Sequence, residues 1–273
     1  MKRRSARNRT LRFLRSEIMN NLLEDLPADT VINRVNDGLT ITQRRQGLKF
    51  GTDALLLAAY VPETRPPRRA AELGSGTGIV SLLLLARKKA AQIYAYEVQK
   101  DYAALTEKNA CDNSYSDRIT VLCRDIRDAS PSDCGGEVDL VVSNPPYLAA
   151  NAGLRSAAPE MDAARRELNG TIADFACAAS RLLRSGGSFY TVYRPERLVS
   201  LLSALREAAL EPKQLTFVHE YPGASPSLLL CHARKDAGEE LKITRPLFLR
   251  NTRGSETYSA DADAVYSGKP LAF

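Results

Sequence analysis

The 273-residue sequence has little of what metal centres, disulfide frameworks and membrane spans require. It contains two histidines far apart, His219 and His232, and five cysteines, of which no two form a Cys-x-x-Cys pair. This spacing offers no ligand set for zinc and favours reduced thiols in a reducing, cytoplasmic compartment. The longest apolar stretch, residues 79–86, includes Ser81 and is followed by three basic residues, so it is too short to cross a bilayer. We therefore expect no metal, no disulfide and no membrane partner.

Positive charge is concentrated at one end of the chain. The sequence has 38 basic and 32 acidic side chains, and residues 1–20 hold seven of the basic ones against one acid. The remainder is balanced at 31 to 31, so the excess belongs to an arm rather than to a basic domain. Three interpretations of this segment stay open: an arm that neutralises RNA phosphates, an organelle transit peptide, or a stretch upstream of a start at Met19.

The chain divides into three predicted parts. They are a basic N-terminal arm at residues 1–29, helical or without regular structure, one domain at 30–248, and a C-terminal tail at 249–273. Ahead of the main pattern, Asp37-Gly38 suits the turn of a hairpin, and Asp53 suits the cap of a helix over residues 54–60.

Strand-like and helical stretches alternate from Ala70 onward. Strands are predicted at residues 70–73, 92–96, 119–123, 138–142, 187–192, 215–218 and 228–232, and helices at 79–89, 100–109, 172–183 and 198–209. This alternation predicts an α/β fold in which helices cover both faces of a parallel sheet. Because ligands bind beyond the carboxyl ends of such strands, the loops that follow strands are where chemistry is expected.

A glycine-rich loop joins the first of these strands to its helix. The glycines Gly74, Gly76 and Gly78 have Gly-x-Gly-x-Gly spacing and not the Gly-x-Gly-x-x-Gly spacing of dinucleotide sites. Gly74 and Gly76 allow a tight turn, and Gly78 would let the helix begin close to the sheet. Glu72 precedes the loop, where it would repel a diphosphate. A cofactor with a cationic amino-acid end and no phosphate fits this loop better.

Acidic residues follow the next two strands. Glu97 ends the second strand, 25 residues after Glu72, where a carboxylate can accept both hydroxyls of a ribose. Asp125 follows the third strand and can accept a hydrogen bond from an adenine amino group. Ribose, adenine and a cationic methionine end together describe S-adenosylmethionine. The alternative is a loop that only packs a helix, with two acids as solvated strand ends.

The fourth strand runs into Asn144-Pro145-Pro146-Tyr147. The prolines, Pro145 and Pro146, restrict the backbone and hold the Asn144 amide and the Pro145 carbonyl as two acceptors at one spot. Two acceptors suit a planar NH₂ group, and accepting both hydrogens stabilises the positive charge that develops on its nitrogen during attack. The Tyr147 ring offers a face for stacking. Catalysis would be mostly positioning, without a metal. The alternative is a rigid exit from the strand.

These motifs together resemble the class I amino-methyltransferases, which include adenine-N6 and glutamine-N5 enzymes. More specifically, the chain is similar to the bacterial adenine-N6 methyltransferases of valine tRNA, which modify the adenosine 3′ of the anticodon. Further similar segments are residues 49–58, 164–167, 194–198 and 256–259. The resemblance implies a Rossmann-like class I fold with a seven-stranded, mostly parallel sheet and an antiparallel last strand. It also implies S-adenosylmethionine as cofactor and tRNA as partner.

By the same resemblance, Thr52 and Asp53 would help to hold the cofactor's amino-acid end, unless they are a simple helix cap. The long stretch 148–170 carries three arginines that could hold RNA phosphates or be ordinary surface charge. Two other functions stay open: glutamine-N5 methylation of a release factor or ribosomal protein, and non-catalytic RNA binding on the same fold. The sequence leaves the oligomeric state unknown.

Overall fold

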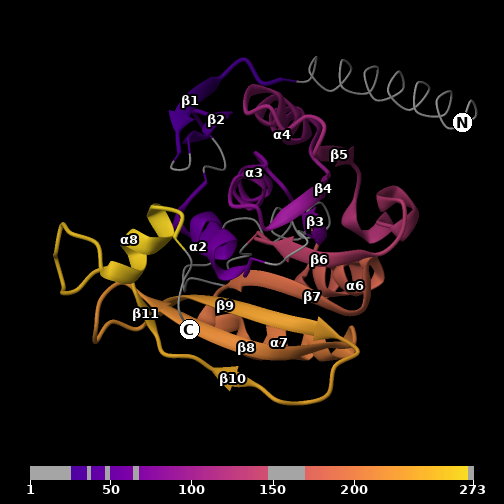
Figure 1. Ribbon diagram of the computed structural model, residues 1–273. Helices are drawn as coiled ribbons and strands as arrows, with labels where there is room; N and C mark the ends of the chain where they lie inside the picture. Colours follow the sequence, from indigo (N-terminus) through magenta and orange to yellow (C-terminus); the bar gives the residue numbers. More distant parts are fainter. Residues whose placement is uncertain (1–25, 36–37, 47–49, 64–67, 147–169, 270–273) are drawn as a thin grey trace, which may run out of the picture.

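One large sheet organises the part of the chain that the computed structural model describes, namely residues 26–35, 38–46, 50–63, 68–146 and 170–269 (Figure 1). Its main strands, in order across the sheet, are β5 (Ile119–Cys123), β4 (Ala90–Glu97), β3 (Arg68–Leu73), β6 (Val138–Ser143), β7 (Leu183–Tyr193), β9 (Pro226–Lys235) and β8 (Leu210–His219).

The strand directions confirm the predicted topology. Strands β3 to β7 run parallel, and β9 runs antiparallel to both of its neighbours, β7 and β8. Two short strands, β10 (Lys242–Ile243) and β11 (Leu247–Phe248), pair with β8 and extend the sheet beyond the seven predicted strands. The carboxyl ends of all the parallel strands therefore lie along one edge.

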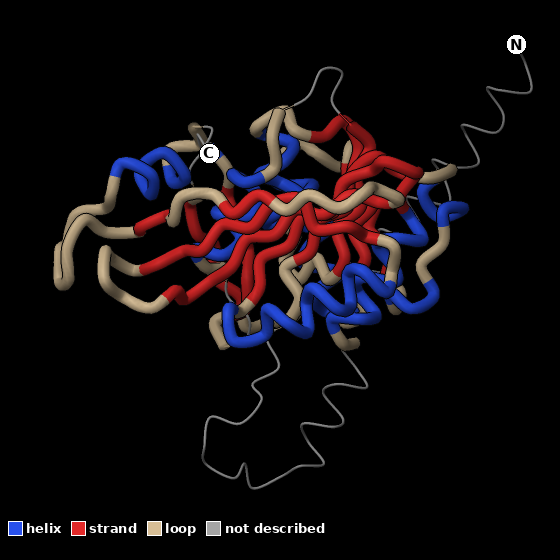
Figure 2. Tube along the Cα trace, turned by 90° about the horizontal axis from the view of Figure 1, so that it is seen from below, coloured by secondary structure: helices blue, strands red, loops and turns tan. Residues whose placement is uncertain are grey.

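Helices cover both faces of the sheet (Figure 2). Helices α2 (Thr52–Tyr60), α3 (Ile79–Ala86) and α4 (Lys100–Asp112) contribute to one buried apolar cluster, and α6 (Ile172–Leu182) and α7 (Leu198–Glu207) to the other. Seven of the eight residues of α3 are buried, which matches its nearly continuous apolar sequence. None of the described helices is both long and apolar enough to span a membrane.

Short 3₁₀ helices occupy two of the connections. These are η2 (Ile126–Asp128) and η3 (Pro131–Cys134) between β5 and β6, and η4 (Pro195–Arg197) after β7. Asp125 caps η2 by accepting a hydrogen bond from the Arg127 amide at 2.8 Å. The cap gives this acidic residue a structural partner before any ligand is considered.

The predicted hairpin is present and lies against α4. Strands β1 (Thr30–Arg34) and β2 (Thr40–Arg44) are antiparallel, and Gly38 between them has the positive φ of 74° that its turn requires. The Asn109 side chain of α4 accepts from the Thr42 amide at 2.7 Å and donates to the Thr42 carbonyl at 2.9 Å. It also donates to the Thr77 carbonyl of the glycine loop at 2.8 Å, so it links the hairpin to that loop.

The C-terminal segment adds helix α8 (Ala260–Tyr266), which packs beside α2 (Figure 1). Ser259 caps this helix, and Val265 is 1% exposed within the same apolar cluster as α2. The division of the chain into arm, domain and tail stays a prediction, and residues 1–25 of the arm lie outside the described residues. Residues 260–266 nevertheless share the core of the main domain.

Candidate active site

Neighbouring strands bring the predicted site residues to one edge of the sheet. Leu73, the last residue of β3, pairs with Tyr96 of β4 on one side and with Ser143 of β6 on the other. Glu97 and Asn144 are the next residues along those two flanking strands. The Ser143 hydroxyl donates to the Leu73 carbonyl at 2.9 Å, which ties the exit of β6 to the exit of β3. The glycine loop thus lies between Glu97 and Asn144.

The glycines of this loop have different neighbours. A Cβ on Gly78 (φ 78°) would lie 2.8 Å from Thr106 Cγ2 of α4, closer than real Cβ contacts. Gly78 therefore allows close packing against α4, a contact that the sequence did not indicate; its predicted role in letting the helix begin close to the sheet stays a prediction. A Cβ on Gly74 would meet the Phe175 ring at 3.4 Å, whereas one on Gly76 (φ 56°) would meet nothing within 4 Å. The open space beside Gly76 is where a ligand could approach the backbone.

Glu97 is fixed against the loop. Its Oε2 accepts from the Gly76 amide at 2.8 Å, and its Oε1 accepts from the Gln99 amide at 2.9 Å. The residue is 6% exposed, and burial raises the pKa of Glu97. Because a carboxylate has about four lone-pair sites, these backbone bonds still leave capacity to accept from a ligand hydroxyl. This geometry suits the predicted role in holding a ribose.

Glu72 lies beneath the loop and bonds to α3. It is 2% exposed and accepts from the Ser81 amide at 3.0 Å and from the Ser81 hydroxyl. Burial raises the pKa of Glu72 to about 8. The described contacts of its carboxyl are internal to the protein, so its direct contact with a cofactor remains a prediction.

Asp125 has a partner that sequence reasoning missed. Arg127 donates to it through Nε at 3.0 Å and through Nη2 at 2.5 Å, and the same guanidinium lowers the pKa of Asp125. An adenine amino group would have to share the carboxylate with Arg127. The Asp-x-Arg spacing in the sequence was the signal that could have indicated this pair.

Asn144 meets Asp53, which the sequence separates from it by 91 residues. Asn144 Nδ2 donates to Asp53 Oδ2 at 3.0 Å. Asp53 does not cap α2 as predicted: Gly51 is the N-cap and Asp53 lies in the first turn. Pro145 is buried and Pro146 is exposed, while Tyr147 and the arginines of 148–169 lie outside the described residues. The roles of Asn144, Pro145, Pro146 and Tyr147 remain predictions.

Thr52 bonds to the C-terminal helix. Its Oγ1 lies 2.9 Å from the hydroxyl oxygen of Tyr266, and the two are hydrogen bonded. The Tyr266 ring packs on the Tyr258 ring at 4.5 Å between centroids. No motif in the sequence pointed to Tyr266, because the contact joins residues 214 positions apart. Helix α8 therefore reaches the turn that also carries Asp53.

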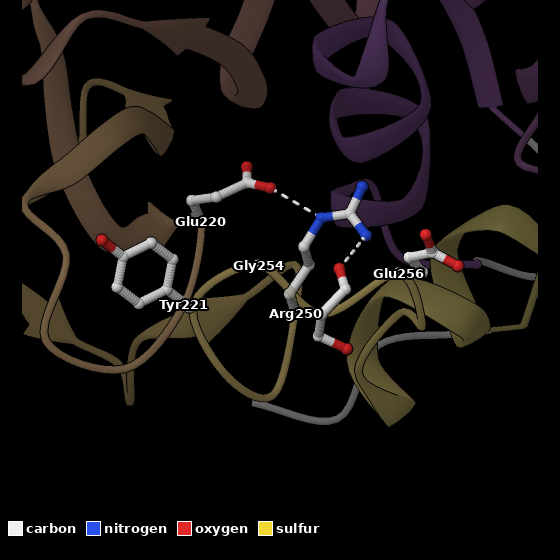
Figure 3. Close-up of a pocket in the computed structure, with 6 residues that line it drawn as sticks. Glu220, Tyr221, Arg250, Gly254 and Glu256 are labelled. Atoms are coloured by element: carbon white, nitrogen blue, oxygen red, sulfur yellow. Dashed lines mark hydrogen bonds and ion pairs between the residues drawn. The ribbon is translucent and has the colours of Figure 1, made fainter.

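A separate pocket of about 370 Å³ lies between the loop after β8 and the loop before α8 (Figure 3). Arg250 points between the two loops, and its Nε donates to Glu220 Oε1 at 2.8 Å and its Nη1 to the Ser255 carbonyl at 2.5 Å. The acidic Glu256 also lines it. With Arg250 bonded to an acid and to the backbone, the pocket is poorly suited to a phosphate. Among the described residues, no cluster of histidine, cysteine or acidic side chains could hold a metal ion.

Comparison with known proteins shows similarity along most of the chain. The family model for the methyltransferase small domain matches residues 45–210. The tRNA1(Val) (adenine(37)-N6)-methyltransferase of Tolumonas auensis is 33% identical over 238 residues, which are 83% of this chain and 93% of that protein. Its counterpart in Porphyromonas gingivalis is 30% identical over 199 residues, 71% of this chain and 77% of that protein.

Solved structures share the fold. A predicted O-methyltransferase of Agrobacterium tumefaciens has a TM-score of 0.65 and 25% identity, covering 81% of this chain and 98% of its own. Methanocaldococcus jannaschii Trm5 in complex with adenosine has a TM-score of 0.54 and 17% identity, covering 77% of this chain and 57% of its own. With the strand order, these similarities confirm the Rossmann-like class I methyltransferase fold. The chain belongs to the methyltransferase small domain family and is a methyltransferase related to the bacterial tRNA1(Val) (adenine(37)-N6)-methyltransferases.

Proposed function

We propose that this methyltransferase transfers the methyl group of S-adenosylmethionine to N6 of an adenine in tRNA, and that its target is the adenosine 3′ of the anticodon of a valine tRNA. The observation that carries the proposal is the pairing of Leu73 with Ser143, which makes the glycine loop and Asn144 direct neighbours. A methyl donor held by the loop would lie next to an amine held by Asn144. We base the choice of substrate on the names of the related proteins, which are tRNA1(Val) (adenine(37)-N6)-methyltransferases.

The residues present fit this cofactor. The space beside Gly76 leaves room for it, and the buried Glu97 carboxylate suits its ribose hydroxyls. Asp125 would accept from the adenine amino group while bonded to Arg127. When bound, the cofactor supplies an electrophilic methyl group on a sulfonium. Glu72, under the loop, is bonded to Ser81 at the start of α3 and would support the loop from below.

The loop after β6 would hold the target amine. An exocyclic adenine amine is a weak nucleophile because its lone pair is delocalised into the ring. Asn144 Oδ1 and the Pro145 carbonyl would each accept one of its hydrogens, which stabilises the positive charge that grows on nitrogen as the methyl is attacked. Pro145 is buried, so the backbone that carries both acceptors is held in place. Tyr147 would stack on the base after it leaves the RNA stack.

A methyl-transfer assay tests the proposal. Labelled S-adenosylmethionine is offered with bulk tRNA in one tube and with release factor in another, with the Asn144→Ala variant as background. We expect label in N6-methyladenosine of the tRNA, and sequencing should locate it 3′ of the anticodon in valine tRNA. Label on a glutamine of the protein substrate would replace the adenine assignment with the glutamine-N5 alternative. Binding of RNA without any transfer would support a non-catalytic role instead.

A further inference from the structure

We propose that Asp53 is a positioning residue that fixes which end of the Asn144 amide faces the substrate. The inference rests on the proposed function, because that function gives the Asn144 oxygen its role as hydrogen-bond acceptor. The structural basis is the 3.0 Å hydrogen bond from Asn144 Nδ2 to Asp53 Oδ2.

The two ends of the Asn144 amide are nearly equal in size but opposite in chemistry. The terminal torsion of asparagine is broad and roughly two-fold, so the side chain alone does not select one orientation. With the oxygen toward the substrate, the amide accepts an N–H of the target amine; with the nitrogen toward it, two donors face each other. Only the first orientation can assist the methyl transfer.

An ionised carboxylate makes this selection because it accepts hydrogen bonds and cannot donate them. Asp53 can therefore bond the NH₂ end of Asn144, whereas a flipped amide would bring its oxygen against a carboxylate oxygen. A charge-assisted bond at the nitrogen also polarises the amide and makes its oxygen a stronger acceptor. Asp53 would thus act on both the orientation and the strength of the acceptor.

The start of α2 holds the Asp53 carboxylate in place. Its second oxygen, Oδ1, accepts from the Ala54 amide at 2.9 Å. The N-cap is Gly51, and a Cβ there would lie 2.9 Å from this same oxygen, so the missing side chain leaves room for the carboxylate. The first turn of a helix also favours negative charge, so this position suits a carboxylate side chain.

This role differs from contact with the cofactor's amino-acid end, and kinetics can separate the two. In Asp53→Ala, a positioning role predicts kcat about tenfold lower, with the Kd for S-adenosylmethionine changed by less than about twofold. Glu63→Ala removes an exposed acid shortly after the same helix, and it should change neither value. A raised Kd with unchanged kcat would overturn the proposal in favour of cofactor binding.

A second readout needs no activity. In the ¹⁵N-labelled protein, the side-chain NH₂ signals of Asn144, identified by their loss in Asn144→Asp, should shift in Asp53→Ala and stay in place in Glu63→Ala. Unmoved signals in Asp53→Ala would overturn the inference even if tRNA methylation is confirmed. If no substrate amine is methylated by the natural protein, the proposed function fails, while the NMR comparison still decides whether Asp53 orients Asn144.

Asp53→Asn covers the case in which the alanine variant does not fold. It keeps the size of the side chain, but an amide at position 53 can turn either end toward Asn144 and no longer selects one orientation. We expect kcat to fall between those of the natural protein and Asp53→Ala, with the Kd for S-adenosylmethionine unchanged. Turnover equal to that of the natural protein would show that the carboxylate is not needed, and would overturn the proposal.

Discussion

The proposed cofactor half of the site, around the glycine loop, and the proposed substrate half, around Asn144, differ in where their hydrogen-bond partners come from. In the glycine loop, Gly76 bonds Glu97 and Thr106, which are 21 and 30 residues away. Around Asn144, the partner Asp53 is 91 residues away, and Thr52 beside it bonds Tyr266 over 214 residues. Consecutive βα units thus build the proposed cofactor half, whereas the surroundings of Asn144 bring together segments that are far apart in the chain. Substitutions around the glycine loop should therefore change mainly the Kd for S-adenosylmethionine, and substitutions around Asn144 mainly kcat.

The largest effect is expected for Asn144→Ala, which removes an acceptor at the reacting nitrogen. We expect kcat to fall by at least about a hundredfold, as for the loss of one donor or acceptor that stabilises transition-state charge. Calorimetry should find the Kd for S-adenosylmethionine nearly unchanged, because the glycine loop does not depend on this side chain. Undiminished turnover would refute the catalytic assignment, and a large rise in the Kd would show that the two halves are not separable.

Glu97→Ala should give the next largest effect, on cofactor affinity. The variant loses a buried acceptor for the ribose and the bond to the Gly76 amide, so the Kd should rise about 10- to 100-fold. Asp125→Ala should raise it less, by about fivefold, because this more accessible carboxylate is shared with Arg127. Titration calorimetry on both variants measures the order. Equal losses would mean that Arg127 does not compete with the adenine.

Glu72→Gln tests how far the cofactor half depends on its buried acid. Burial raises the pKa of this carboxyl to about 8 from an ordinary value of 4.5. The stability that this carboxyl contributes is therefore fully present when the pH is below its ordinary pKa of 4.5. It is lost as the pH rises through about 8. Between about pH 6 and pH 7, the natural protein should lose about 1.4 kcal/mol of unfolding free energy relative to Glu72→Gln. Denaturant unfolding of both proteins at several pH values measures this difference, because the other titratable groups contribute equally to both. If the two curves of unfolding free energy against pH run parallel, the prediction is contradicted.

Tyr266→Phe should have the smallest effect, and only on the substrate half. It removes the hydrogen bond to Thr52, which should lower the free energy of unfolding by about 0.5–1.5 kcal/mol. Because the first turn of α2 also carries Asp53, kcat should fall by about two- to threefold, with no change in the Kd for S-adenosylmethionine. Thermal unfolding and steady-state kinetics test both. A change in cofactor affinity alone would place α8 with the cofactor half.

Much of the fold could be predicted because local patterns carry it. The alternation of apolar stretches located every strand of the parallel sheet, and β5 has the predicted bounds, Ile119–Cys123. The glycine spacing located the loop, but it did not indicate that Gly78 also leaves room for Thr106 of α4. The cap assigned to Asp53 was wrong because the helix begins at Thr52, two residues before the predicted start at residue 54.

Local sequence patterns were enough to give the fold class, the glycine loop and the placement of Glu97, Asp125 and Asn144 at the ends of their strands. These features follow from periodicity and from short motifs, which are properties of consecutive residues. The hydrogen bonds between Asp53 and Asn144 and between Tyr266 and Thr52 depend instead on how the elements pack in three dimensions. Contacts of this kind leave no periodic signal, since they exist only once packing has brought distant segments together.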